Sequence, residues 1–207
     1  MKKIVIPFVL VFALFFSACN LSLPDIPDND TTTPEEAERA YLPREINLAF
    51  NQNDSLNPFT AKTNLNLSIM PLLYDSLVRI NEDYILRNNI ARSITVSDNI
   101  YTIIINGGIK FSDGSDLGAE DVVYSLNRAR QSGYFSRFLT NVSRVSLVNR
   151  IKLEITLNSP DVFFPYNLTV PIIKNGSSNS NVPIGSGRFK VDDNSENHLV
   201  FLRVRSI

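Results

Sequence analysis

Apolar and polar residues alternate along much of the chain after residue 44, and this pattern predicts more strand than helix. The clearest case is 151–157, where four apolar side chains beginning with Ile151 alternate with polar ones, so one face of the strand is wet. Shorter apolar segments, several of them joined by Asn- or Asp-containing turns, predict strands at 46–50, 78–80, 84–86, 94–96, 101–105, 109–111, 145–148, 191 and 199–204.

Helical periodicity is confined to two segments. The spacing of apolar residues predicts a helix over about 64–78, which Pro71 should kink or break. A second helix has Glu120 and Asp121 in its first turn, where the helix dipole favours negative charge. Its buried stripe is formed by Val122, Leu126 and Ala129. Because strands outnumber helices and no internal repeat is present, we predict an α+β fold.

Composition excludes several classes of function. The 207 residues contain one cysteine, Cys19, and one histidine, His198, so no intrachain disulfide can form. The same scarcity argues against most soft-metal sites and against Ser-His or Cys-His nucleophiles. The formal charge of −1 comes without a basic block, which argues against nucleic acid as a partner. We expect no cofactor and no metal.

The first 43 residues have the layout of an export and anchoring segment. A basic start and an apolar run ending in small residues predict a signal peptide over 1–18. Cys19 then stands at a lipobox-like ending, and acylation of its thiol would tether the protein to a membrane. The polar stretch within 19–43 predicts a disordered tether. The alternative is an ordinary signal or an uncleaved anchor with an incidental cysteine.

Six motifs follow one another in a characteristic order, and FSDG with AEDVVYS is the most specific combination among them. They are SLNP at 55–58, LYDSLV at 73–78, KFSDG at 110–114, AEDVVYS at 119–125, NSP at 158–160 and PIGSGRF at 183–189. In this order the chain resembles, over about 44–191, the family 5 extracellular solute-binding proteins, which are peptide- and nickel-binding receptors of ABC importers. Gly118 departs from the family, which usually has Thr or Asn as the helix cap there.

The resemblance implies the N-terminal part of a two-lobed, periplasmic-binding-protein-like fold. Residues 44–63 would supply the first strand and loop of lobe I, 64–170 an inserted α+β subdomain, and 171–207 the return to lobe I. Family members are two to three times longer, and the second lobe that clasps the ligand comes later in them. We therefore expect a truncated receptor in which that lobe is missing.

The resemblance also nominates residues for the ligand cleft. Asn53, Asp54 and Ser55 in the first loop and Lys174 are implied as ligand-binding residues. Two aromatic residues, Phe135 and Phe138, are a further ligand-binding prediction, although such a patch is more often core. Gly185 and Gly187 are implied as a crossover turn near the hinge, and no phosphate-loop motif accompanies them. Four acidic residues near the second helix fit turn and helix-start roles better than a cation site; they are Asp113, Asp116, Glu120 and Asp121.

These observations predict an exported, lipid-anchored monomer on the outer face of the cell membrane. It would bind a small solute, of peptide type, and deliver it to the permease subunits of an ABC importer. Because closure of two lobes supplies affinity in such receptors, we expect weak or no binding by this chain, and micromolar peptide binding by residues 20–207 would refute this. One rival is a surface lipoprotein fragment with a structural or protein-contact role. The other rival is a hydrolase. The sequence argues against it, because it contains no GxSxG motif and its one histidine, His198, lies near the end.

Overall fold

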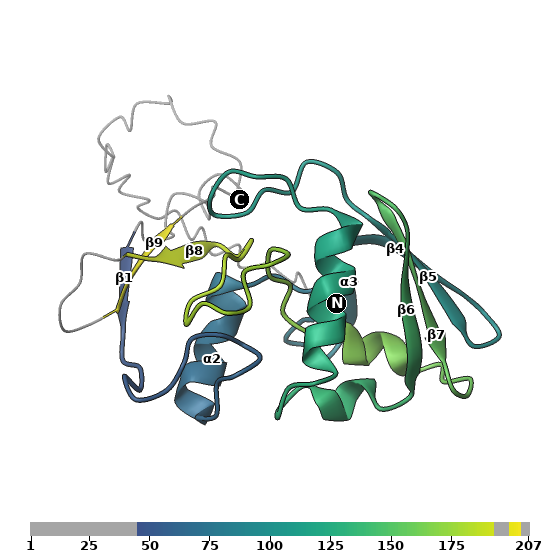
Figure 1. Ribbon diagram of the computed structural model, residues 1–207, viewed down its shortest axis with the longest axis horizontal. Coiled ribbons are helices and arrows are strands. Elements are labelled where there is room, and N and C mark those ends of the chain that lie inside the picture. The colour runs from purple at the N-terminus through teal and green to yellow at the C-terminus, as the bar shows by residue number, and fades with distance from the viewer. Residues whose placement is uncertain (1–44, 193–198, 204–207) are drawn as a thin grey trace, which may run out of the picture.

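The computed structural model describes residues 45–192 and the backbone of 199–203. The predicted signal peptide, Cys19, the tether and His198 lie outside these residues. Two bodies are visible in Figure 1, with a small sheet and helix α2 at one end and a larger sheet with helix α3 at the other. This mixture of many strands and few helices confirms the α+β prediction. No helix in the described part of the chain has the length and apolar composition of a membrane span.

The small sheet joins the beginning and the end of the described chain. Strand β1 (Glu45–Leu48) pairs with β9 (Leu199–Arg203), which pairs in turn with β8 (Phe189–Val191), and both pairings are antiparallel. Helix α2 contacts β8. The chain therefore leaves this sheet after β1 and returns to it at β8, with everything else inserted between, as Figure 1 shows.

The larger sheet is an antiparallel array in the order β4-β5-β7-β6. Its strands are β4 (Ala91–Ser97), β5 (Ile100–Ile105), β6 (Val142–Asn149) and β7 (Lys152–Leu157). Leu153 and Ile155 are fully buried, as the alternation predicts, but Ile151 is 49% exposed. The prediction for Ile151 was wrong because this residue lies in the tight turn between β6 and β7 and not in the strand.

Two further strand predictions need correction. The hairpin that begins with β2 (Val78–Ile80) has its second strand, β3, at Leu86–Asn88, whereas the apolar pattern placed it at 84–86. Tyr84 adopts φ 60°, a left-handed conformation that suits a turn and not a strand. The predicted strand at 109–111 forms only an isolated bridge between Lys110 and Asp116.

Helix α2 (Asn64–Leu73) is five residues shorter than the predicted helix over 64–78. The Thr63 hydroxyl oxygen caps the start of the helix by accepting a hydrogen bond from the backbone N–H of Asn66. Pro71 lies in the last turn of the helix. Proline has no backbone N–H to donate to the helix, and its ring crowds the preceding turn, so it destabilises the helix at this point. The residues after Leu73 are extended, and Ser76 bridges to Pro171. The helix continues past Pro71 to Leu73, so it is not broken at the proline as predicted, and the predicted C-terminal turn is wrong.

Helix α3 (Ala119–Ala129) packs on the larger sheet against β6 and β7. Gly118 has no side chain to cap it, but the Asp121 carboxylate accepts the Gly118 N–H at 2.8 Å. A second oxygen of Asp121 accepts the N–H of Asn175 at 2.8 Å, which ties the start of the helix to a distant loop. Burial raises the pKa of Asp121, and these donors oppose that rise. The predicted buried stripe is confirmed for Val122, Leu126 and Ala129.

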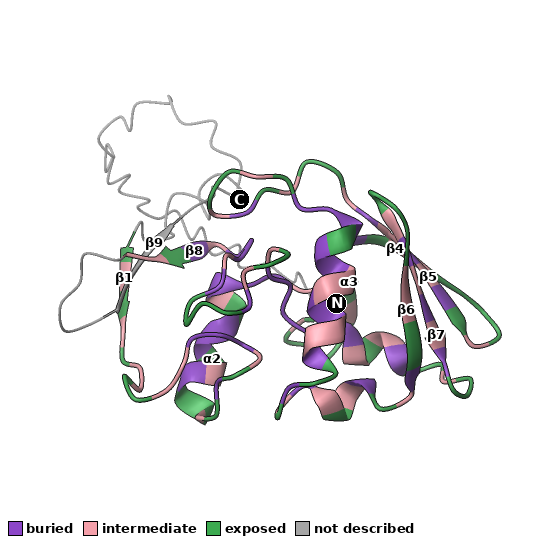
Figure 2. Ribbon diagram, in the orientation of Figure 1, coloured by how far each residue is buried: buried purple, intermediate pink, exposed green. Residues whose placement is uncertain are grey.

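Two hydrophobic clusters divide the interior. The larger lies between α3 and the β4–β7 sheet and takes buried residues from Leu77 to Ile172, including those of the 3-10 helices η1 (Ser136–Leu139) and η2 (Phe164–Leu168). The smaller combines α2 with the β1-β9-β8 end of the molecule and includes Ile173. Figure 2 marks the buried residues of α2 and α3 in purple. The chain passes from one cluster to the other between Tyr74 and Leu77 and again between Ile172 and Ile173.

Candidate functional site: the aromatic hollow

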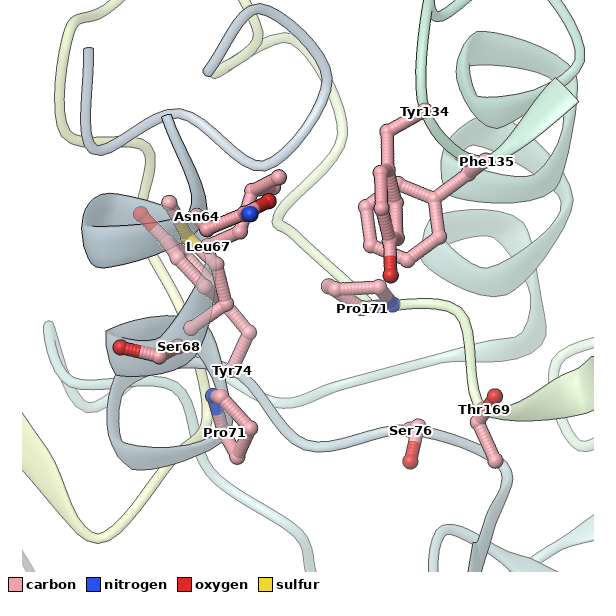
Figure 3. Close-up of a pocket in the computed structure, with 11 residues that line it drawn as sticks. Asn64, Leu67, Ser68, Pro71, Tyr74, Ser76, Tyr134, Phe135, Thr169 and Pro171 are labelled. Atoms are coloured by element: carbon pink, nitrogen blue, oxygen red, sulfur yellow. The ribbon is translucent and has the colours of Figure 1, made fainter. Parts of the chain in front are cut away.

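An open hollow of about 360 Å³ lies between α2 and the aromatic residues that precede η1. We call it the aromatic hollow, and Figure 3 shows α2 on one side and Tyr134 with Phe135 on the other. Its wall is made of residues from α2, the extended segment after it, the 134–135 turn and the 169–171 segment. They are Asn64, Leu67, Ser68, Met70, Pro71, Tyr74, Ser76, Tyr134, Phe135, Thr169 and Pro171.

The wall on α2 follows from helical geometry. Asn64, Leu67, Ser68 and Pro71 stand at i, i+3, i+4 and i+7, so they lie on one face of the helix. Other residues of α2, including Ile69 and Leu73, are buried in the smaller cluster. The helix thus packs one face into the core and turns another toward the hollow.

The opposite wall is an aromatic cluster held by its own contacts. The ring of Phe135 meets those of Tyr134 at 4.9 Å, Phe138 at 6.2 Å and Phe59 at 6.3 Å between centroids. The guanidinium of Arg137 lies over the Tyr134 ring at 4.2 Å and near the Phe138 ring at 5.0 Å. Only 8% of Phe135 is exposed. The cluster is therefore a preformed surface, and Phe138 supports it from behind.

The remaining wall is the crossing between the two clusters. Ser76 bridges to Pro171, and the Ile172 N–H donates to the carbonyl oxygen of Asp75 at 2.8 Å. Thr169 and Ser76 lie together at this end of the hollow in Figure 3. Because this crossing links the two bodies, a molecule in the aromatic hollow would touch both of them.

The polar groups of the hollow are neutral, and three are already engaged. The hydroxyls of Ser68, Ser76 and Tyr74 donate to backbone carbonyl oxygens of Leu65, Val78 and Leu56, respectively. Burial raises the pKa of Tyr74 far above its usual range, so the phenol stays neutral. Within the part of the chain that the structure describes, the polar side-chain atoms of Asn64, Tyr134 and Thr169 have no hydrogen-bond partner. These groups can donate to or accept from a solute.

Three of the predicted ligand-binding residues line a different, polar hollow of about 400 Å³. Asn53, Asp54 and Ser55 meet there with residues of the same loop and with Asn181 from a loop far along the chain. The Ser55 hydroxyl donates to the Asn181 carbonyl oxygen at 3.1 Å. The structure thus brings these three together but places Phe135 in the aromatic hollow.

The carboxylate of Asp54 is occupied by its own loop. It accepts the Thr63 hydroxyl and the Thr63 N–H, each at 2.7 Å, together with the N–H groups of Lys62 and Ser55. These donors hold the pKa of Asp54 well below its usual range. Asp54 therefore shapes the loop and the capped start of α2.

Two buried asparagines that sequence reasoning did not single out anchor the same loop. The Asn57 amide donates to the carbonyl oxygens of Ser178 at 2.7 Å and Ser180 at 2.9 Å. The Asn66 side chain accepts the N–H of Asn51 at 2.7 Å and donates to two carbonyl oxygens of the loop. Asn66 occupies a helix position in phase with Ile69 and Leu73, which is the one pattern that could have marked it as buried.

Lys174 lines neither hollow. Its ammonium group pairs with Asp113 at 2.6 Å, and the Ser115 hydroxyl donates to the same carboxylate at 2.6 Å. These two partners lower the pKa of Asp113 to about 2. Asp116 instead pairs with Lys110 and Arg150, and Asp121 caps α3. Across residues 45–192, no three acidic, histidine or cysteine side chains gather as metal ligands.

The two glycines of the predicted crossover turn pass directly over the end of α2. The Gly187 N–H donates to the Leu73 carbonyl oxygen at 2.9 Å. A Cβ atom at Gly185 would lie 2.1 Å from that oxygen, and one at Gly187 would lie 2.4 Å from the Leu72 carbonyl oxygen. Only glycine allows the returning chain to come so close to the helix. The turn lies where the chain re-enters the smaller cluster.

Solved structures share this fold. NikA from Brucella suis in complex with Fe(III)-EDTA matches with a TM-score of 0.64 and 21% identity, over 77% of this chain and 36% of that one. The oligopeptide-binding protein AppA from Bacillus subtilis, in complex with a nonapeptide, matches with a TM-score of 0.58 and 22% identity, over 68% of this chain and 32% of that one. The chain thus has the fold of one part of a periplasmic binding protein.

Sequence comparison identifies the family. The model for bacterial extracellular solute-binding proteins, family 5, middle part, matches residues 86–205, which is more than half of the chain. This protein belongs to the family 5 bacterial extracellular solute-binding proteins, as its motifs indicate. The glutathione-binding protein GsiB from Escherichia coli O1:K1 is 28% identical over 184 residues, 82% of this chain and 36% of GsiB. The chain spans about a third of the length of the curated relatives it matches.

Proposed function

We propose that this chain is the extracytoplasmic solute-binding component of an ABC importer and that the aromatic hollow is its contribution to the solute cleft. The observation that carries the proposal is the hollow itself, with preformed aromatic and apolar walls and three neutral polar groups that have no hydrogen-bond partner among the described residues. Its place at the crossing between two bodies supports a role in a site that opens and closes. No bond is made or broken in this function.

Peptides are the solute class that we propose. Two relatives carry names that fit it, since GsiB is called a glutathione-binding protein and AppA an oligopeptide-binding protein. Phe135 would touch the solute directly, whereas Phe138 would act by holding Phe135 in place. The polar hollow with Asn53, Asp54 and Ser55 would form a second contact region, in which Asp54 keeps the loop in shape.

The division of the chain that we propose has a signal peptide at 1–18, acylated Cys19 with a tether to residue 43, lobe I at 44–63 and 171–207, and an inserted subdomain at 64–170. The return of β8 and β9 to β1 supports the lobe I assignment. The one adjustment that we propose is to count α2 (64–73) with lobe I, because its buried residues belong to the smaller cluster; the inserted subdomain then begins after Leu73. Gly185 and Gly187 would lie near the hinge, Lys174 would act at the cleft only after releasing Asp113, and the lipid would anchor the exported protein beside its permease.

A titration followed by NMR tests the proposed site. The isotope-labelled full chain in mild detergent is titrated with trialanine, and we expect chemical-shift changes at Leu67, Tyr134 and Thr169. Because the chain spans a third of its relatives, we expect a dissociation constant on the order of 1 mM or weaker, about −4 kcal/mol. The variant Ser68→Trp, which fills the hollow from an exposed position, should abolish the changes. The control Ser97→Trp should leave them, and equal effects of the two variants would refute the site.

A further inference from the structure

We infer that the aromatic hollow takes the uncharged, apolar side chain of a peptide, with the neighbouring peptide amides on Asn64, Tyr134 and Thr169, and that it disfavours acidic side chains. This inference rests on the proposed function and specifies the class of solute. The inferred preference differs from the one that the name of the glutathione-binding relative implies, because glutathione carries two carboxylates.

The first support is the absence of charge from the wall. None of the eleven lining residues is Asp, Glu, Lys, Arg or His. The polar hollow differs in this respect, because Asp54 and Lys62 both line it. A carboxylate that entered the aromatic hollow would lose water without gaining a counter-charge, which is costly.

The second support is the position of Arg137, a cation that follows the aromatic wall in sequence. Arg137 is adjacent in sequence to the aromatic cluster, but its guanidinium lies over the Tyr134 and Phe138 rings. In this position it stabilises the ring that forms the wall and does not line the hollow. Meeting a carboxylate in the hollow would require Arg137 to leave both rings and so give up the cation–π contacts.

The third support is the match between the remaining groups and a peptide. Leu67, Pro71, Phe135 and Pro171 supply apolar surface, and the two prolines and the packed Phe135 ring are stiff. The Asn64 amide, the Tyr134 phenol and the Thr169 hydroxyl, which have no partner in the described part of the chain, can serve both the N–H and the C=O of a peptide unit. Figure 3 shows the α2 residues and the aromatic pair facing each other, so a side chain inserted between them would touch both walls.

Capped amino acids test the inference without the charges of free termini. The isotope-labelled full chain in mild detergent is titrated with N-acetylphenylalanine amide, N-acetylleucine amide, N-acetylglutamine amide and N-acetylglutamate amide, and the shifts of the hollow residues are recorded. We expect the phenylalanine and leucine probes to bind about tenfold more tightly than the glutamate probe. The glutamine probe, which has the shape of glutamate without its charge, should fall between them.

A charge placed in the wall provides the reverse test. Ser68 is exposed and lies on α2, so Ser68→Lys should keep the fold, and it should strengthen binding of the glutamate probe about threefold or more. The control Ser97→Lys introduces the same charge at an exposed position of β4 and should change nothing. An equal gain from both variants would contradict the inference.

The possible failures differ in their signature. If glutamate shifts the hollow residues at concentrations as low as phenylalanine does, the solute class is wrong while the proposed site stands. If none of the four probes shifts Leu67, Tyr134 or Thr169, the proposed site fails and the inference fails with it.

Discussion

The close passage of Gly185 over the end of α2 makes a quantitative prediction. Replacing Gly185 by alanine would place a methyl group 2.1 Å from the Leu73 carbonyl oxygen and 2.5 Å from the Tyr74 ring, whereas ordinary contact begins at 3.4 Å. The obstacle is backbone, so it cannot turn aside as a flexible side chain does. The two segments must separate by more than about 1 Å, and overpacking of this kind costs about 1–3 kcal/mol.

The separation also stretches the hydrogen bond from Gly187 to Leu73, which adds about 1 kcal/mol. We therefore expect Gly185→Ala to lower the free energy of unfolding by about 2–4 kcal/mol, measured by urea denaturation followed by circular dichroism. Gly107 is the matched control, because it is exposed and a Cβ there would meet nothing within 4 Å. Gly107→Ala should change stability by less than about 0.5 kcal/mol. A loss below that limit for Gly185→Ala would refute the proposed role of this crossing.

Three further predictions concern single contacts. The pKa of Asp113 is lowered from 3.8 to about 2, so its ion pair stabilises the fold above pH 4 and this contribution is lost as the pH falls toward 2. In an acid titration of stability, Asp113→Asn should therefore flatten the decline over that range. Asn66→Ala removes three hydrogen bonds of a fully buried side chain and should cost about 2–3 kcal/mol in urea denaturation, whereas Asn64→Ala on the exposed face of the same helix should cost less than about 0.5 kcal/mol. Leu153→Ala should cost about 2–5 kcal/mol. Its cross-strand partner Leu147 is on the same face of the sheet but in the edge strand β6, where it is 50% exposed, so Leu147→Ala should cost much less. Equal thermal shifts for the pair would contradict the burial of Leu153 in the larger cluster.

Alternation and helix-start chemistry predicted the parts of the fold in which one face is buried and the other is wet. Strand β7 and helix α3 are of this kind, and apart from Ile151 their inward residues, among them Leu153, Val122 and Leu126, were identified correctly. The errors lie at boundaries, where apolar residues continue past the end of an element. Leu77 kept the helical spacing although the chain after Leu73 is extended, and Ile151 kept the strand spacing although it lies in a turn.

The candidate site was only partly predictable, because contacts between distant segments decide it. The aromatic residues around Phe135 were visible as a local cluster in sequence. The facing wall on α2 consists of Asn64, Leu67, Ser68 and Pro71, which carry no chemical signature and are recognisable only once the helix faces the aromatic cluster. Lys174 pairs with Asp113, a residue 61 positions earlier in the sequence, and no local pattern reveals this contact.

The most direct test of the central claim is where a bound peptide lies on the protein. A tripeptide carrying a diazirine analogue of leucine is photolysed with the full chain, and the adducts are located by mass spectrometry. We predict adducts on 64–71 and on 134–135, which are competed away by N-acetylphenylalanine amide. Adducts confined to the polar hollow at 52–55, or spread over the surface without competition, would contradict the account.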